Sequence, residues 1–257
     1  MAIDNAKHKF KKSLGQNFLR DEGFLESIVK SLGLSKSDTV IEVGAGEGIL
    51  TRALNRHAGQ VVSFEVDRSL EPKLQGLNVR FEDALYADID VGEYKVVANV
   101  PYYITTPLLF KFIKDENCTE ISVLVQREVA DRIIARVGTK EYGALSVAVQ
   151  AWGTVKKVRD VPRYMFTPQP NVDSSFIQIV RASRQVISPM LLKGLFSYRR
   201  KTVENGLMKL YGRSRDEVGV VLDNLGINRK LRPENLGVEE YLRLSEAILR
   251  AWMHKEE

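Results

Sequence analysis

The segment TVIEVGAGEGILT, residues 39–51, passes from a short apolar run into three closely spaced glycines, Gly44, Gly46 and Gly48. The run TVIEV predicts a buried strand, and the amphipathic residues 47–58 that follow predict a helix. Glycines at such a turn let a ligand approach the backbone closely, and the helix N-terminus adds hydrogen-bond donors. The spacing is GxGxG rather than the GxGxxG of dinucleotide sites, so a tight loop explains the motif equally well when it is taken alone.

The front two-thirds of the chain repeats this alternation of strand and helix patterns. Further short strands are predicted over residues 61–65, 79–82, 95–99 and 121–126. Residues 106–115 carry one of the helical patterns that lie between them. Such alternation predicts βαβ units, and therefore an α/β fold with a parallel sheet covered by helices on both faces.

The pattern changes after residue 143. Residues 144–161 and 174–181 read as longer strands joined by the Pro-rich segment PRYMFTPQPNVD. Two strands joined in this way predict an antiparallel pair that closes one edge of the sheet.

The last part of the chain loses its β signal from about Ser188 onward. Helical patterns separated by Gly or Pro follow over residues 189–212, 214–226 and 237–257. We therefore expect a domain boundary near Arg184. Residues 1–184 would form the α/β domain, and residues 185–257 a small all-α domain.

Composition narrows the class of protein. The 257 residues are 44% apolar and 28% charged, which is ordinary for a soluble globular protein. There is no apolar run of about 18 residues and no signal-peptide core, so we expect no membrane span and a cytoplasmic protein. The single Cys118 fits a reducing compartment, and three histidines with one cysteine predict no metal site. The net charge of +5 leans toward an anionic partner such as nucleic acid.

Acidic residues follow the next two predicted strands. Glu65 lies about 20 residues beyond the glycines, where an acid can accept hydrogen bonds from the ribose hydroxyls of an adenosine cofactor. Asp83 can accept from an adenine amine, with Ala84 offering its backbone. No phosphate-binding lysine accompanies these residues, which favours S-adenosylmethionine over a polyphosphate. Taken alone, Glu65 could be a solvated acid at a strand end, but glycines and two acids after three successive strands together favour a ligand site.

The fourth strand ends in ANVPYY, and Asn99–Tyr102 resembles the N-[LIVP]-P-Y motif of methyltransferases that act on exocyclic amines. The lone pair of adenine N6 is delocalised into the ring, so the amine is a poor nucleophile. The Asn99 side-chain oxygen and the Val100 carbonyl can accept the two N6 hydrogens and favour a tetrahedral nitrogen. Pro101 would hold the turn rigid, and Tyr102 would stack on a base swung out of its own stack. The alternative is an Asn-Pro turn with core tyrosines.

Three further segments sharpen the resemblance. KKSLGQNFLRD (11–21) and FTPQPNVDSSF (166–176) resemble the N-terminal signature and the post-motif loop of rRNA adenine dimethyltransferases. FSYRRKTVENGL (196–207) resembles a segment of the bacterial small-subunit branch of that family. The resemblance implies a Rossmann-like class I methyltransferase that uses S-adenosylmethionine. It also implies a monomer that dimethylates two adjacent adenines in the 3′-terminal hairpin of 16S rRNA, within a 30S-like assembly particle.

The family also implies roles for single residues. Asn17 and Leu19 would contact the cofactor beside the glycines, and Phe166 would form a second wall of the base pocket. Gln16 and Asn17 could instead cap the helix that begins near Asp21, and Phe166 could be an ordinary core aromatic. Glu42 could reach the cofactor's ammonium through water or be a structural acid. Val100 and Tyr103 depart from the family, which more commonly has Leu and Asn there, and the role of Tyr103 stays open.

Two basic runs could neutralise RNA phosphates. They comprise Lys7, Lys9, Lys11 and Lys12, and Arg199, Arg200 and Lys201. A run of charges is usually a solvated face, but for Arg199, Arg200 and Lys201 we favour RNA binding.

Other functions compete with 16S rRNA dimethylation. A 23S rRNA adenine N6-methylase would share the catalytic motifs, but the segment FSYRRKT argues against it. A DNA adenine methyltransferase would share Asn-x-Pro-Tyr, but no separate DNA-reading domain is evident. A ribosome-assembly or transcription factor could use the fold without turnover, and the intact Asn99–Tyr102 motif argues for an enzyme.

Overall fold

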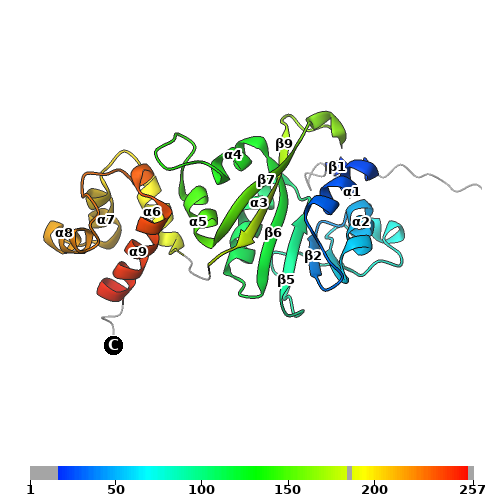
Figure 1. The fold of residues 1–257 in the computed structure, drawn as a ribbon, viewed down its shortest axis with the longest axis horizontal. Helices are drawn as coiled ribbons and strands as arrows, with labels where there is room; N and C mark the ends of the chain where they lie inside the picture. Colours follow the sequence, from blue (N-terminus) through cyan, green and yellow to red (C-terminus); the bar gives the residue numbers. More distant parts are fainter. Residues whose placement is uncertain (1–16, 184–186, 254–257) are drawn as a thin grey trace, which may run out of the picture. The chain divides into compact units, whose positions relative to one another are not determined.

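A computed structural model describes residues 17–183 and 187–253 (Figure 1). The basic run at residues 7–12 lies outside them. The strands form one seven-stranded sheet in the order β4-β3-β2-β5-β6-β9-β7. They are β2 (Thr39–Val43), β3 (Gln60–Phe64), β4 (Val79–Arg80), β5 (Tyr94–Ala98), β6 (Cys118–Gln126), β7 (Gly153–Val161) and β9 (Ser174–Arg181). The five strands predicted before residue 127 are confirmed.

The register of the central strands places their ends side by side. β2 pairs in parallel with β3 on one side and with β5 on the other. Val43 is level with Phe64 and with Ala98, the last residues of the neighbouring strands. The next residues of the three chains are Gly44, Glu65 and Asn99. Residues that the sequence separates by about 20 to 55 positions therefore meet at the carboxyl edge of the sheet, where open α/β folds bind ligands.

Helix α1 (Glu22–Ser31) precedes β2, α2 (Ile49–His57) connects β2 to β3, and α3 (Tyr102–Lys114) connects β5 to β6. Asp21 caps α1, because its Oδ1 accepts from the backbone N of Phe24 at 2.8 Å. Asn17 is therefore not needed as the cap, and Gln16 lies outside the described residues. α3 begins at Tyr102, four residues earlier than predicted, so that the Asn-Val-Pro-Tyr turn leads directly into a helix.

A buried apolar core lies between the central strands and helices α1 and α2. Val40, Val97 and Leu124 pack with Ile28 of α1 and Leu54 of α2, and each of these five side chains is buried. Removing such side chains from water supplies the main favourable term in folding. A rigid packed layer behind the strands thus holds their carboxyl ends in place.

The first half of one predicted strand is wrong. Ala144–Trp152 is helix α5 rather than the first half of a strand, and β7 begins only at Gly153. Seven of the nine residues of α5 are buried, so the segment shows neither a helical stripe nor a strand alternation. Periodicity alone cannot distinguish a fully buried helix from a buried strand. In this protein the segment forms a helix. β9 and β7 complete one edge of the sheet, where the sequence predicts them.

The C-terminal helices are shorter than predicted. They are α6 (Pro189–Ser197), α7 (Val203–Tyr211), α8 (Arg215–Asn224) and α9 (Val238–Ile248), and α9 continues into the π-turn η5 (Leu249–Met253). The helix predicted over residues 189–212 is interrupted at residues 198–202. Thr202 starts a new helix there, because its hydroxyl accepts from the backbone N of Asn205. The basic residues Arg199–Lys201 therefore lie on a turn between two helices.

The chain divides into two compact units. The first runs to Arg127 and resumes at Lys157–Gln178, and the second comprises Glu128–Lys156 and the chain from Ile179 onward. Inside the second unit, the segment with α4 (Arg127–Ile133) and α5 packs on the C-terminal helices: Tyr142 donates its hydroxyl to the Leu236 carbonyl. The division into a catalytic domain before residue 184 and an RNA-contacting domain after it stays a prediction.

Candidate active site at the carboxyl edge of the sheet

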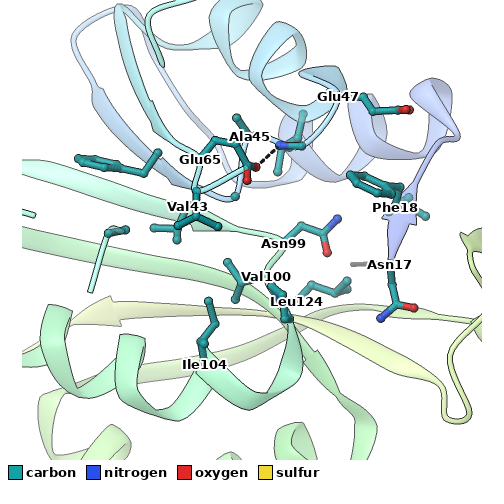
Figure 2. Close-up of a pocket in the computed structure, with 18 of the residues that line it drawn as sticks. Asn17, Phe18, Val43, Ala45, Glu47, Glu65, Asn99, Val100, Ile104 and Leu124 are labelled. Carbon is teal, nitrogen blue, oxygen red and sulfur yellow. Dashed lines mark hydrogen bonds between the residues drawn. The ribbon is translucent and has the colours of Figure 1, made fainter. Parts of the chain in front are cut away.

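A cavity of about 320 Å³ opens at the carboxyl ends of β2, β3 and β5 (Figure 2). Its walls contain every described residue predicted to contact the cofactor or the base. They are Asn17, Leu19, Gly44, Gly46, Glu65, Asp83, Ala84, Asn99, Val100, Pro101, Tyr102 and Phe166. The first unit of the chain alone supplies this wall.

The glycine turn brings two motifs into contact. Gly44 has φ +81, a left-handed conformation that residues with a side chain rarely adopt. A Cβ on Gly44 would lie 3.3 Å from the backbone oxygen of Asn99. Glycine at this position therefore lets the turn after β2 lie directly against the Asn-Val-Pro-Tyr turn after β5.

Glu65 is held by the backbone on both carboxylate oxygens. Oε2 accepts from the N of Gly46 at 2.9 Å (Figure 2), and Oε1 accepts from the N of Asp67 at 2.8 Å. A carboxylate offers about four lone-pair sites, so each oxygen keeps capacity for a ligand hydroxyl. Glu65 is therefore oriented before any ligand arrives.

The turn after β4 is fixed to helix α3. Asp83 Oδ1 accepts from the N of Leu85 at 2.9 Å, which closes a local turn. Lys111 of α3 donates its ammonium to the carbonyls of Ala84 at 2.7 Å and Ala87 at 2.6 Å. Burial lowers the pKa of the Lys111 ammonium from its usual value. Lys111 thereby ties the acidic turn of the cavity to the helix that begins with Tyr102.

Asn99 and Tyr102 face the cavity from one turn but are held differently. Figure 2 shows the Asn99 side chain projecting between Glu65 and Asn17. The Tyr102 hydroxyl lies 2.7 Å from the Oγ of Ser174, a fully buried residue at the start of β9. Burial raises the pKa of the Tyr102 hydroxyl, which therefore stays neutral at physiological pH. The ring of Tyr102 is anchored at both ends.

The N-terminal signature and the post-motif loop close one wall together. β1 (Phe18–Leu19) pairs antiparallel with β8 (Phe166–Thr167), which sets Leu19 opposite Phe166. Both side chains are buried and both line the cavity. Phe166 also belongs to the apolar core, so its two readings are compatible; its contact with a target base stays a prediction.

Comparison with known proteins identifies the family. The pattern described as Ribosomal RNA adenine dimethylase matches residues 7–249. The chain belongs to the ribosomal RNA adenine dimethylase family. It is therefore an enzyme that uses S-adenosylmethionine to methylate adenine in ribosomal RNA.

Relatives and solved structures agree with this family. A protein of Clostridioides difficile named Ribosomal RNA small subunit methyltransferase A is 42% identical over 269 residues, covering 96% of this chain and 93% of the relative. The protein of the same name from Enterococcus faecalis is 40% identical, and the match covers 93% of this chain and 90% of that protein. A dimethyladenosine transferase from Plasmodium falciparum superposes with a TM-score of 0.79 at 25% identity, covering 91% and 98%. The 23S rRNA methyltransferase ErmE gives 0.66 at 28% identity, covering 90% and 99%.

The cavity of this dimethylase fits S-adenosylmethionine. A cradle of glycine backbone, an oriented carboxylate in Glu65 and an acceptor in Asp83 suit an adenosine. Within the described ranges, no three His, Cys, Asp or Glu side chains gather as a metal ion would require. None of the helices in these ranges has the length and apolar character needed to cross a membrane.

Glu42 is separated from the cavity wall. It is fully buried, and its Oε2 accepts from the hydroxyls of Thr51 at 2.6 Å and Ser63 at 2.5 Å. Burial raises its pKa from 4.5 to about 7, and the charge of Glu65 adds to this rise. Its Oε1 has no hydrogen-bond partner among the described residues. The geometry favours the structural role of this acid in the dimethylase.

Several wall residues were missed by sequence reasoning. They are Phe18, Glu47, Val66, Glu82, Tyr103 and Leu124. Phe18 and Tyr103 adjoin residues that the motifs had marked, so adjacency was the available signal. Ser174 does not line the cavity and was signalled only by its place in the DSSF segment.

The basic turn after α6 contains two kinds of residue. Arg199 donates to the carbonyl of Thr139 at 3.2 Å and lies 3.6 Å from the Glu234 carboxylate, both within the second unit. Arg200 and Lys201 are exposed. The RNA role predicted for Arg199 thus competes with a structural one, while the other two side chains are accessible to a phosphate.

Proposed function

We propose that this dimethylase transfers four methyl groups to two adjacent adenines in the 3′-terminal hairpin of 16S rRNA, two to each N6. The Asn99–Tyr102 turn on the cavity wall carries this proposal, because it supplies two acceptors and an aromatic ring at one point. The small-subunit name of relatives 40% to 42% identical supports the choice of 16S rRNA.

The side chains of the turn would divide the work. Asn99 Oδ1 and the Val100 carbonyl accept the two N6 hydrogens, which localises the nitrogen lone pair. Pro101 fixes the turn, and Tyr102, anchored on Ser174, stacks on the extruded base. S-adenosylmethionine supplies a methyl group bonded to a positively charged sulfur. The methylated amine is cationic and releases its proton afterwards, so no side chain must remove a proton first.

The parts of the chain would have separate tasks. Residues 1–184 bind the cofactor and perform the transfer, and residues 185–257 contact rRNA. Arg200 and Lys201 are the exposed cations for that contact, joined by Lys7, Lys9, Lys11 and Lys12 of the N-terminal run. The enzyme would act as a monomer, without metal, on a 30S-like assembly particle in the cytoplasm.

A second candidate is methylation of 23S rRNA. The superposition on ErmE supports it, at 28% identity. The small-subunit relatives are more similar and cover as much of the chain, which favours 16S rRNA. A non-catalytic assembly role would leave the four-residue turn without a use.

Transfer of labelled methyl groups separates these functions. The wild-type protein is incubated with immature small subunits, naked 16S rRNA or 23S rRNA, and the products are mapped by mass spectrometry. We expect N6,N6-dimethyladenine at two adjacent positions near the 3′ end of 16S rRNA. Label confined to 23S rRNA, or no label in any RNA, would overturn the proposal.

Asn99 provides the test of mechanism. Asn99→Ala removes one acceptor from the transition state, and such losses cost about 10²- to 10³-fold in rate. Asn99→Asp keeps an acceptor and should be impaired less. The assay is single-turnover transfer at saturating S-adenosylmethionine, beside a thermal melt of each variant. A near-normal rate in folded Asn99→Ala would contradict amine activation by this turn.

A further inference from the structure

Tyr103 is exposed at the edge of the cavity. It lines the cavity, yet its side chain is 65% exposed, whereas the preceding Tyr102 is half-buried and hydrogen-bonded to Ser174. Successive residues of a helix point about 100° apart, so the two rings face different parts of the cavity. Tyr102 belongs to the inner wall and Tyr103 to the mouth.

The exposed ring has no structural use inside the protein. Across residues 17–183 and 187–253, no hydrogen bond, ion pair or ring contact involves the Tyr103 side chain. Single exposed aromatics are common on protein surfaces. Tyr103 differs from a random one because it follows directly on the turn that receives the target base.

The proposed substrate has a second adenine whose face is left without a stacking partner near Tyr103. When one of two adjacent adenines leaves its stack and enters the pocket, its neighbour loses a stacking partner. The backbone between them is one nucleotide long, so the neighbour must stay near the mouth. An aromatic ring there can replace the lost stacking.

Two exposed arginines adjoin the loop that anchors Tyr102. Asp173, next to Ser174, accepts through its carbonyl from the N of Arg127 and through Oδ1 from the N of Arg163, both at 3.0 Å. Both arginines are exposed and can contact phosphates. Glu47 and Glu82 also line the cavity, but Glu47 is paired with Arg20 and Lys73, and Glu82 with Arg80. The loop that anchors Tyr102 thus lies beside two exposed cations available to an RNA strand.

We propose that the Tyr103 ring is a stacking platform for the adenine next to the target adenine, so that the enzyme holds both bases of its substrate at once. This inference rests on the function proposed above. It gives Tyr103 a role in place of the family's commoner Asn. The ring, rather than the hydroxyl, carries the interaction.

Binding of two synthetic RNA hairpins tests the platform. One hairpin carries two adjacent adenines in its loop, and the other has an abasic nucleotide in place of one of them. Affinity is measured by fluorescence anisotropy with S-adenosylhomocysteine present. Tyr103→Ala should weaken binding of the first hairpin about tenfold, within the range known for base–aromatic stacking. It should change binding of the abasic hairpin less than twofold.

Three comparisons isolate the ring. Tyr103→Phe should bind both hairpins as the wild type does. Tyr86→Ala serves as the matched control, because Tyr86 is 84% exposed but does not line the cavity, and it should be neutral. S-adenosylhomocysteine affinity, measured by calorimetry, should be unchanged in every variant.

The outcomes are distinct. Equal loss on both hairpins, or no loss on either, would overturn the platform while leaving the methyltransferase function intact. A wild-type protein that binds neither hairpin and methylates no 16S rRNA would overturn the proposed function, and this inference with it.

Discussion

The hydroxyl of Tyr102 lies 2.7 Å from the Oγ of Ser174, although 72 residues separate them in the chain. Tyr102 starts α3 at the end of the Asn-Val-Pro-Tyr turn, and Ser174 starts β9 at the end of the post-motif loop. The bond joins two motifs that lie far apart in the sequence. It positions the ring on which we expect the target adenine to stack.

The two halves of this contact predict different effects. Tyr102→Ala should lose base stacking, about 1–3 kcal/mol, and slow methyl transfer with little change in cofactor affinity. Tyr102→Phe and Ser174→Ala each remove the bond but keep the ring, so both should cost less. The double variant should be no worse than either single one, because they remove the same bond. Single-turnover methyl transfer measures all four, and a wild-type rate in folded Tyr102→Ala would remove this residue from the pocket.

Glu65 should control cofactor affinity. Glu65→Ala removes an acceptor for the ribose hydroxyls and also releases the backbone N of Gly46 and Asp67. Hydrogen bonds to a charged group contribute about 1.5–3 kcal/mol each at most, so we expect at least a tenfold loss in affinity. Calorimetric titration with S-adenosylmethionine measures it. Glu71→Ala, an exposed acid on η2 (Arg68–Lys73), is the control. Unchanged affinity in Glu65→Ala would remove Glu65 from the site.

Glu42 should make stability depend on pH. Its pKa of about 7 in the folded protein exceeds its usual 4.5, so between these values the folded state holds a proton that the unfolded chain releases. The free energy of unfolding therefore falls as pH rises through this window, by on the order of 3 kcal/mol at most.

Glu42→Gln should remove this dependence. The amide resembles the protonated acid, and its oxygen can still accept from Thr51 and Ser63. Urea unfolding at pH 5 and pH 8 would compare the two proteins. If wild type and Glu42→Gln lose the same stability between these pH values, the buried acid does not titrate in this range.

Substitutions in the basic turn after α6 should have two different effects, one on RNA binding and one on stability. Replacing Arg200 and Lys201 by Ala should weaken rRNA binding and lower the salt slope of log K by up to about two charges. Arg199→Ala should instead lower the melting temperature, because Arg199 contacts Thr139 and Glu234. Filter binding at several salt concentrations and thermal melts measure these. An unchanged salt slope in the double variant would show that Arg200 and Lys201 form a solvated face and do not contact RNA phosphates.

Local sequence alone determined where the predicted ligand-contacting residues at the strand ends lie. Strand periodicity placed Gly44, Glu65 and Asn99 each just beyond a strand, and parallel strands bring such residues to one edge of a sheet. The α/β class, the glycine turn and the identity of the acceptors all follow from residues close to each other in the chain. These residues line the cavity as local pattern predicts, whereas wall residues such as Phe18 and Glu47 carried no such signal.

Tertiary structure alone decided what depends on distant partners. The pairing of Leu19 with Phe166 and the bond from Tyr102 to Ser174 join segments with no shared local pattern. Residues 144–152 form a helix that is buried on nearly all sides, and Glu42 is buried behind the cavity wall. The periodicity of a sequence does not indicate how deeply a residue is buried. Secondary structure and residue chemistry are encoded over a few neighbours, whereas burial and long-range hydrogen bonds exist only once the whole chain has packed.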